Sequence, residues 1–212
     1  MKGKAAKGMA PKGTAARRTA TQGTAGKPRA AEPGTHVALF RGINVGTAKR
    51  VSMGDLRALA EGLGFTGART LLNSGNLVFT AKGRSAGGAA ARLEEALAAR
   101  CGISARVTVV SAAELAAAVA GNPLVTRASD PSRLLVWFSG KPADLARLQP
   151  LAARGWEPDA LALGGRVAYG WCPAGVLESP LAKAAGKALG DSVTARNWAT
   201  VLKLHALLGG AP

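Results

Sequence analysis

The sequence predicts an α+β protein of two ferredoxin-like halves packed together, each with the element order β-α-β-β-α-β, after a disordered basic tail. Three observations support this fold. The first 34 residues show no hydrophobic period, two later stretches repeat the same order of strands and helices, and 48% of the 212 residues are hydrophobic. We divide the chain into a tail at 1–34, a first half with a linking helix at 35–121, and a second half with an extra helix at 132–210. Identity between the halves is negligible, so the duplication rests on element order.

The tail concentrates positive charge. Residues 1–33 hold five Lys and three Arg against Glu32 alone, and so supply +7 of the net charge of +16. A polycation attracts phosphate backbones through counterion release, without sequence preference. The tail therefore predicts non-specific nucleic-acid binding. Two alternatives remain open: a solvated tail that keeps the protein soluble, or translation that begins at Met9.

The composition also bounds location and metal content. The apolar runs are far shorter than the roughly 20 residues of a membrane span, and no apolar block follows the N-terminal cations, so we expect a cytoplasmic protein that does not enter membranes. Cys101 and Cys172 lie in no CxxC motif and near no His. We expect two reduced thiols, no metal and no cofactor.

The first half begins at residues 36–40, a short apolar strand that runs into a glycine-containing loop. Ser52 is the predicted N-cap of the next helix, with Asp55 at the capping-box position, and Gly64 ends that helix. The remaining elements follow from periodicity and turn residues: strands at 68–72 and 76–80, a helix at 86–100 and a strand at 106–110.

A second capping box, Ser111 to Glu114, begins the linking helix. The second half then repeats the order: a strand at 134–138, a helix from Pro142 to Leu148, a hairpin that turns at Gly164-Gly165, a helix from the Ser179 cap to Gly190, a strand at 191–194 and a helix at 197–208.

The loop of residues 41–50, RGINVGTAKR, joins the first strand to the first helix. Gly42 and Gly46 permit positive φ, so consecutive N–H groups can turn inward as an anion-binding concavity. Arg41, Lys49 and Arg50 place cations around it. The loop matches neither a P-loop nor GxGxxG. The alternative is an ordinary glycine turn.

Two further segments carry polar residues at element ends. The hairpin turn Asn73-Ser74-Gly75-Asn76 has residues that any tight turn favours. Arg196 and Asn197 precede a helix whose free N–H groups attract anions. Capping requires Asn197 or Thr194 but not Arg196. The helical spacing that follows Trp198 favours a core position for that side chain.

These segments resemble the signature of DUF1697, a bacterial domain of unknown function. The resemblance rests on RGINVG, on SGN in the hairpin and on RNW-x-TV-x-KL near the end, and it covers residues 35–209. It implies a compact α+β protein of two plait-like halves, without an established activity. The chain departs from the family pattern at Thr47 and over Leu71–Asn73. The change at Thr47 leaves one flexible amide fewer in the loop.

The leading hypothesis is a protein that binds a small anionic or phosphorylated ligand between loops of both halves. Its site would comprise Arg41, Gly42, Asn44, Gly46, Lys49, Asn73, Ser74, Gly75, Asn76, Arg196 and Asn197. No Ser, His and Asp set and no acid pair gathers in these segments, so the sequence predicts no catalytic residue. Two alternatives remain: a nucleic-acid-associated protein that uses the tail and the basic core, and motifs that only pack one half on the other.

Overall fold

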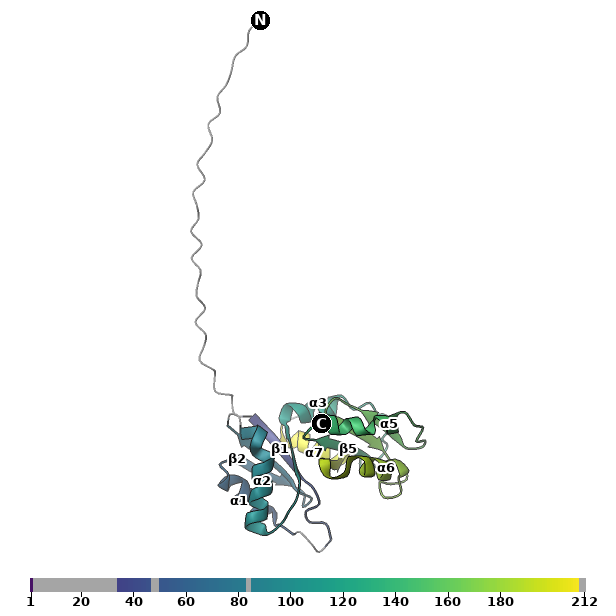
Figure 1. Ribbon diagram of the computed structural model, residues 1–212. Helices are drawn as coiled ribbons and strands as arrows, with labels where there is room; N and C mark the ends of the chain where they lie inside the picture. The colour runs from purple at the N-terminus through teal and green to yellow at the C-terminus, as the bar shows by residue number, and fades with distance from the viewer. Residues whose placement is uncertain (2–33, 47–49, 83–84, 210–212) are drawn as a thin grey trace. The chain divides into compact units, whose positions relative to one another are not determined.

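The computed structural model describes Met1 and residues 34–46, 50–82 and 85–209 (Figure 1). The tail predicted at 1–34 lies outside the described residues apart from its two ends, and so does Lys49. Within the described part, no helix is long and apolar enough to cross a membrane.

The first half forms a four-stranded antiparallel sheet in the strand order β2-β3-β1-β4. Its elements are β1 (Gly34–Phe40), α1 (Met53–Gly62), β2 (Thr66–Leu71), β3 (Asn76–Ala81), α2 (Ser85–Cys101) and β4 (Val107–Ser111). Helices α1 and α2 lie side by side (Figure 1). Leu56 of α1 and Leu93 of α2 are fully buried against Phe40 and Phe79 of the sheet. The two helices therefore cover one face of the first sheet.

The second half repeats that strand order, position for position, as β6-β7-β5-β8. After α3 (Ala112–Ala120), its elements are β5 (Leu134–Ser139), α4 (Pro142–Leu145), the 3-10 turn η1 (Ala146–Leu148), α5 (Gln149–Ala152), β6 (Ala160–Leu163), β7 (Val167–Trp171), α6 (Pro180–Leu189), the 3-10 turn η2 (Gly190–Ser192), β8 (Val193–Asn197) and α7 (Trp198–Leu207). The described chain is thus an α+β protein with two four-stranded antiparallel sheets.

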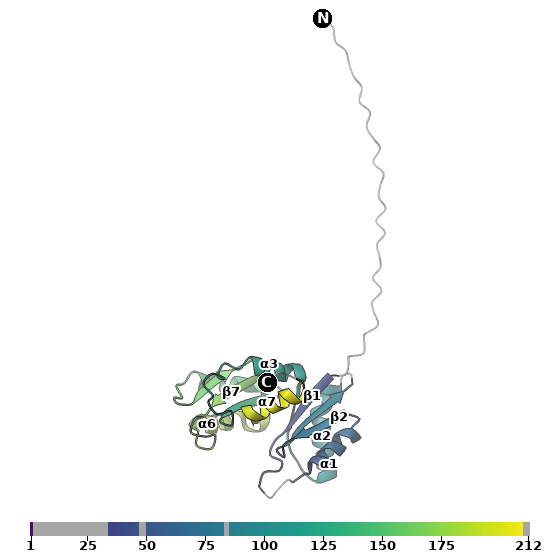
Figure 2. The same cartoon turned by 180° about the vertical axis from the view of Figure 1, so that it is seen from behind.

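One core contains residues from both sheets. Leu39 of β1 and Phe138 of β5 belong to the same buried cluster, together with Leu115 of α3 and Trp198 of α7. Helices α3 and α7 lie side by side (Figure 2). Trp198 is 4% exposed, which confirms the predicted core position. The face of the first sheet that α1 and α2 leave free is therefore covered.

Local capping signals are confirmed. Ser52 accepts a hydrogen bond from the N–H of Asp55, Ser111 and Glu114 form the complete capping box, and Ser179 caps α6 with Pro180 at its first position. Each supplies an oxygen to an N–H that has no partner within its helix. These helix starts depend on neighbours in the sequence.

Two predicted elements differ from the structure. The single helix expected from Pro142 to Leu148 is instead the short helix α4 and the 3-10 turn η1, after which the chain continues as α5. Pro150 has no N–H to donate to the carbonyl of Ala146, which interrupts the α-helical ladder. The last strand lies at Val193–Asn197 rather than 191–194, because pairing with β5 outweighs the weak strand propensity of these residues.

Candidate anion-binding loop

The loop after β1 alternates between left-handed and ordinary backbone. Gly42, Asn44 and Gly46 have φ of 68°, 57° and 62°, and the residues between them do not have positive φ. Ile43 is 1% exposed and anchors the loop in the core between the first sheet and helices α1 and α2, whereas Val45 is 71% exposed. The loop is therefore fixed at its centre and open to solvent beside that anchor.

The side chain of Asn44 holds this conformation. Its Nδ2 donates to the carbonyls of Val51 at 2.9 Å and Asn73 at 2.8 Å, and its Oδ1 accepts from the N–H of Val51 at 2.8 Å. A positive φ in a non-glycine residue persists only where the surroundings enforce it. The three bonds supply that constraint and tie the loop to the hairpin turn.

The N–H groups of residues 42–46 donate to no other described residue. Successive amides in alternating conformations of this kind form a nest, a concavity that attracts anions. The carbonyl of Gly46 is occupied by Nη2 of Arg50 at 3.0 Å, which places a cation at the far end of the loop.

The hairpin turn packs directly beneath the loop. Phe40 donates from its N–H to the carbonyl of Gly75 at 2.8 Å. A Cβ on Gly75 would lie 2.7 Å from Cδ1 of Ile43 and 2.8 Å from Cβ of Phe40, and Gly75 has a φ of 79°. Asn76 is fully buried, and its Nδ2 donates to the Leu71 carbonyl and to Oγ of Ser74. Gly75 and Asn76 thus position the turn, while Asn73 and Ser74 are exposed.

Arg196 reaches this turn from the second half. Its Nε donates to Oδ1 of Asn76 at 2.6 Å, and its Nη1 donates to the carbonyl of Ala195 at 2.8 Å. Nη2 contacts three further carbonyls, those of Phe40, Ser74 and Gly75, at 2.7, 3.0 and 3.0 Å. All five acceptors are uncharged oxygens. Burial lowers the pKa of Arg196 to about 10, so the guanidinium stays charged near neutral pH.

Arg41 contacts β8, the strand that contains Arg196, at the opposite end of that strand. Its Nη1 donates to the Val193 carbonyl at 2.7 Å, and its Nε lies 3.2 Å from Oδ1 of Asp191. The Arg41 side chain is 37% exposed and the Asp191 side chain 84% exposed. Because Asp191 is so exposed, this ion pair is weak and can be replaced by another anion.

A cavity of ≈ 460 Å³ adjoins Arg41 and Gly42. Its lining includes Arg106 and Glu94, which form an ion pair of 3.4 Å, and Asp191 of the second half. The sequence prediction did not include Arg106, Glu94 or Asp191. None of them belongs to a motif, and only the pairing of β1 with β4 brings Arg106 beside Arg41.

The structure therefore brings most of the predicted site residues together. Arg41, Gly42, Asn44 and Gly46 form or flank the loop. Asn44 bonds the loop to the hairpin turn, and Arg196 bonds to the turn at Ser74, Gly75 and Asn76. Asn73 takes part through its backbone carbonyl. Asn197 is instead the N-cap of α7, where its Oδ1 accepts from the N–H of Thr200 at 3.0 Å.

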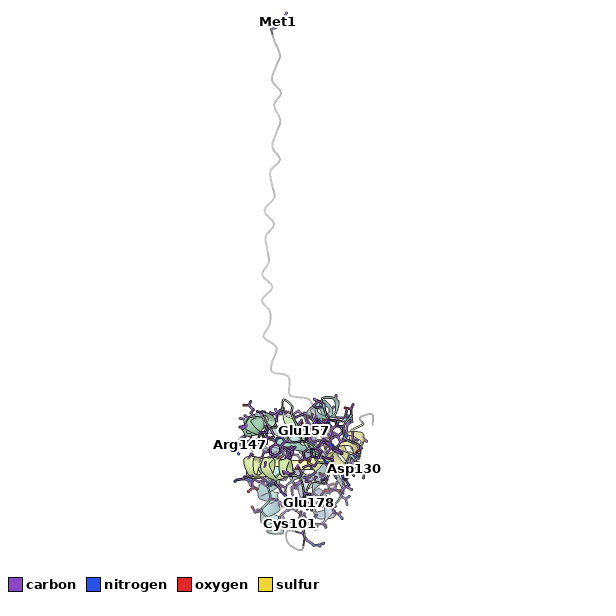
Figure 3. The ribbon with its side chains drawn as sticks, turned by 90° about the vertical axis from the view of Figure 1, so that its right-hand side faces the viewer. Met1, Cys101, Asp130, Arg147, Glu157 and Glu178 are labelled. Atoms are coloured by element: carbon purple, nitrogen blue, oxygen red, sulfur yellow. The ribbon has the colours of Figure 1, made fainter. Side chains whose placement is uncertain are left out.

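The two thiols lie apart from this network. Cys101 ends α2 and is labelled in Figure 3, and Cys172 is fully buried after β7. Burial raises the pKa of the Cys172 thiol. Across residues 34–46, 50–82 and 85–209, no group of three or more His, Cys, Asp and Glu side chains gathers as a metal site would require.

Comparisons with known proteins agree with this fold. The family model described as "Protein of unknown function (DUF1697)" matches residues 34–169, which include the loop and the hairpin but not Arg196. A solved structure, that of the conserved bacterial protein SP0830 from Streptococcus pneumoniae, superposes with a TM-score of 0.63 at 22% identity. It covers 83% of this chain and 99% of its own. Comparison with curated proteins gives no match.

Proposed function

Because the chain belongs to the DUF1697 family of unknown function, we propose its function from its own geometry: it binds a small anionic or phosphorylated ligand on the backbone of residues 42–46. The observation that carries the proposal is the run of alternating positive φ at Gly42, Asn44 and Gly46, with N–H groups that donate to no other described residue. Gly42, Val45 and Gly46 are exposed, so their amides can present partial positive charge to solvent, and an anion can accept from several of them at once.

The surrounding charges support an anion at this loop. Arg41 lies at its start, and Arg106 extends the positive potential into the adjoining cavity. Their carboxylate partners, Asp191 and Glu94, can be displaced because each ion pair has one well-exposed member, Asp191 in the first and Arg106 in the second. A bidentate phosphate or carboxylate would replace one weak ion pair by charge-assisted bonds to a guanidinium and to backbone amides.

In this proposal, the polar residues whose side chains are bonded to the protein itself position the loop and the turn and do not contact the ligand. Asn44 fixes the loop backbone, Asn76 fixes the hairpin turn, and Arg196 joins the turn to the second half. Their hydrogen-bonding groups already have protein partners, and a ligand that took those partners would leave buried carbonyls unsatisfied.

We extend the proposal to the architecture. Each half, at 35–121 and 132–210, is a ferredoxin-like unit, which the shared strand order and the helices on one face of each sheet support. We retain the cytosolic location as part of the same proposal.

A specific observation disfavours the sheet-based form of the nucleic-acid alternative. RNA-recognition units stack bases on an open sheet face, but here that face of the first sheet carries Val37, Leu39 and Val110, all buried in the core that it shares with the second sheet. Nucleic-acid binding through residues 1–33 rests on their charge alone.

A thermal-shift series on the full chain tests the proposal. Inorganic phosphate, sulfate, nucleoside monophosphates, sugar phosphates and small carboxylic acids are added at constant ionic strength. A ligand at about 100 times its Kd stabilises by about 2.7 kcal/mol, which raises Tm by roughly 5–10 °C for a chain of this size.

Two matched substitutions locate the response. Arg41→Gln should abolish it, while Arg133→Gln should preserve it, because Arg133 likewise pairs with one carboxylate, Asp130, and donates to one carbonyl, that of Pro173. A response that both variants lose or both retain would show that the anion binds elsewhere. A response only to oligonucleotides would favour the nucleic-acid alternative.

A further inference from the structure

A second candidate binding site is the outer edge of β4, the edge strand of the first sheet. Arg41 donates from its N–H to the carbonyl of Arg106. Together with the register of β1 and β4, this bond determines which residues of β4 point their N–H and carbonyl groups toward β1. In an antiparallel pair the bonded residues alternate, so Arg106, Thr108 and Val110 bond to β1. Val107, Val109 and Ser111 direct their N–H and carbonyl groups away from the sheet.

Carboxylates cover the two ends of this edge. Oε1 of Glu94 accepts from the N–H of Val107 at 2.8 Å, and Oε2 of Glu114 accepts from the N–H of Ser111 at 2.8 Å. Between them the N–H of Val109 donates to no described residue, and the carbonyls of Val107 and Val109 accept from none. Side chains that block an edge strand protect it from indiscriminate pairing. With respect to the described part of the chain, they leave one donor and two acceptors free.

A groove follows this edge. One cavity of ≈ 470 Å³ and another of ≈ 400 Å³ share Val107 and Gly140, and a third of ≈ 250 Å³ shares Glu114 and Arg166 with the second. A strand rises about 3.3 Å per residue, so the length from Val107 to Ser111 suits about five residues of an added strand.

The two ends of the groove differ in chemistry. The cavity of ≈ 250 Å³ is lined by Ala117, Ala118, Val167 and Tyr169, whose hydroxyl is occupied by the Ala118 carbonyl at 2.8 Å, and suits an apolar side chain. At the other end, Arg106 and Arg147 pair with carboxylates at 3.4 and 3.2 Å. Lys141 lines the same cavity, and its amine has no ion-pair partner among the described residues.

We propose that the β4 edge binds an extended peptide segment of a partner protein, which adds a strand to the first sheet. The peptide exchanges main-chain hydrogen bonds with Val109 and donates to the Val107 carbonyl. It places an apolar side chain against Tyr169 and a carboxylate beside Lys141. The groove shares Glu94, Arg106 and Asp191 with the cavity beside the candidate loop. The peptide contact itself is made at Val107 and Val109 and not at the amides of residues 42–46, so the tests at Val109 and at Arg41 distinguish the two proposals.

Proline at position 109 provides a direct test. Val109→Pro removes the one free N–H without loss of a ladder bond, because this N–H points away from β1, and an edge strand tolerates proline there. Val109→Thr is the matched control, since it keeps the N–H and the β-branched shape. The probes are peptides selected from a random dodecapeptide phage library on the immobilised full chain, then synthesised and measured by fluorescence polarisation.

We expect selected peptides to carry a carboxylate and an apolar residue, to bind the wild type and Val109→Thr equally, and to bind Val109→Pro at least about tenfold more weakly. Lys141→Met should weaken binding and reduce its salt dependence. Selection that yields no binder, or binders that Val109→Pro retains in full, would overturn the proposal.

Hydrogen exchange of the Val109 amide in the wild type tests the peptide-binding proposal even if Val109→Pro does not fold. The Val109 amide should exchange fast in the free full chain and at least tenfold more slowly with saturating peptide. Protection in the free chain would mean that another segment of this chain or a second copy occupies the edge. Exchange that the peptide leaves unchanged would place the peptide elsewhere. Either result would overturn the proposal.

Discussion

Nε of Arg196 lies 2.6 Å from Oδ1 of Asn76, and this bond joins the last strand of the second sheet to the hairpin turn of the first. Asn76 is fully buried and holds the turn through its own Nδ2. The same guanidinium reaches the carbonyls of Phe40, Ser74 and Gly75. The hairpin turn beside the candidate loop is therefore held by a residue more than 100 positions away in the sequence.

Arg196→Ala should destabilise the protein by about 3 kcal/mol, because five oxygen acceptors lose a charged donor. Tm should fall by roughly 6–12 °C, which differential scanning calorimetry measures. Arg166→Ala is the control, since Arg166 is about half exposed and forms an ion pair with Glu114; it should cost less than about 1 kcal/mol. Equal losses would mean that Arg196 contributes no more than a surface arginine.

Gly75→Ala should destabilise much more than Gly64→Ala. Both glycines have nearly the same positive φ, 79° and 80°, so both substitutions carry a similar backbone cost of about 1–2 kcal/mol. Only at Gly75 does the new Cβ meet Ile43 and Phe40 within 3 Å, whereas Gly64 has open space. Urea unfolding should show an additional loss of about 1–3 kcal/mol at Gly75. A similar midpoint for the two variants would contradict the close packing of turn and loop.

Asn44→Gly should be more stable than Asn44→Ala. Both variants lose the three side-chain bonds to Val51 and Asn73, but glycine adopts a φ of 57° without the steric cost that alanine carries. The difference should be about 1 kcal/mol in urea unfolding. If alanine proves equal to glycine, residue 44 does not hold positive φ in solution.

Stability should fall as pH rises above about 9. Burial raises the pKa values of Cys172 and Tyr169 from ordinary values of 9.0 and 10.0. Each group then keeps its proton in the folded chain at a pH where the unfolded chain has lost it, so the contribution is complete below pH 9 and is lost above it. Urea midpoints from pH 8 to 10 should fall less steeply in Cys172→Ala. A wild-type midpoint that stays flat over this range would contradict the burial of both groups as neutral acids.

Local structure was predictable where neighbouring residues determine it. Ser52, Ser111 and Ser179 cap the helices as expected, because a capping hydrogen bond spans only three residues. The role of Arg196 was not predictable in the same way. Most of its partners are backbone carbonyls of the first half. Every residue has a carbonyl, so the sequence does not indicate which ones Arg196 will contact. The open edge at Val109 likewise depends on ladder phase and on the placement of Glu94 and Glu114.

The candidate loop was predictable in outline. The glycines of RGINVG indicated positive φ at positions 42 and 46, and the structure has it. The positive φ at Asn44 and the covering of the first sheet by the second sheet arise from contacts between distant segments. Asp191 was expected within the last strand, but it lies in a 3-10 turn and pairs with Arg41.

The most direct test is a phosphate titration of the full isotope-labelled chain followed by amide chemical shifts. The account predicts that the amides of Gly42, Asn44 and Gly46 shift together along one saturable curve, and that Arg41→Gln removes the response while Arg133→Gln keeps it. Shifts that spread over surface amides without saturation, or that leave residues 42–46 unchanged, would contradict the account.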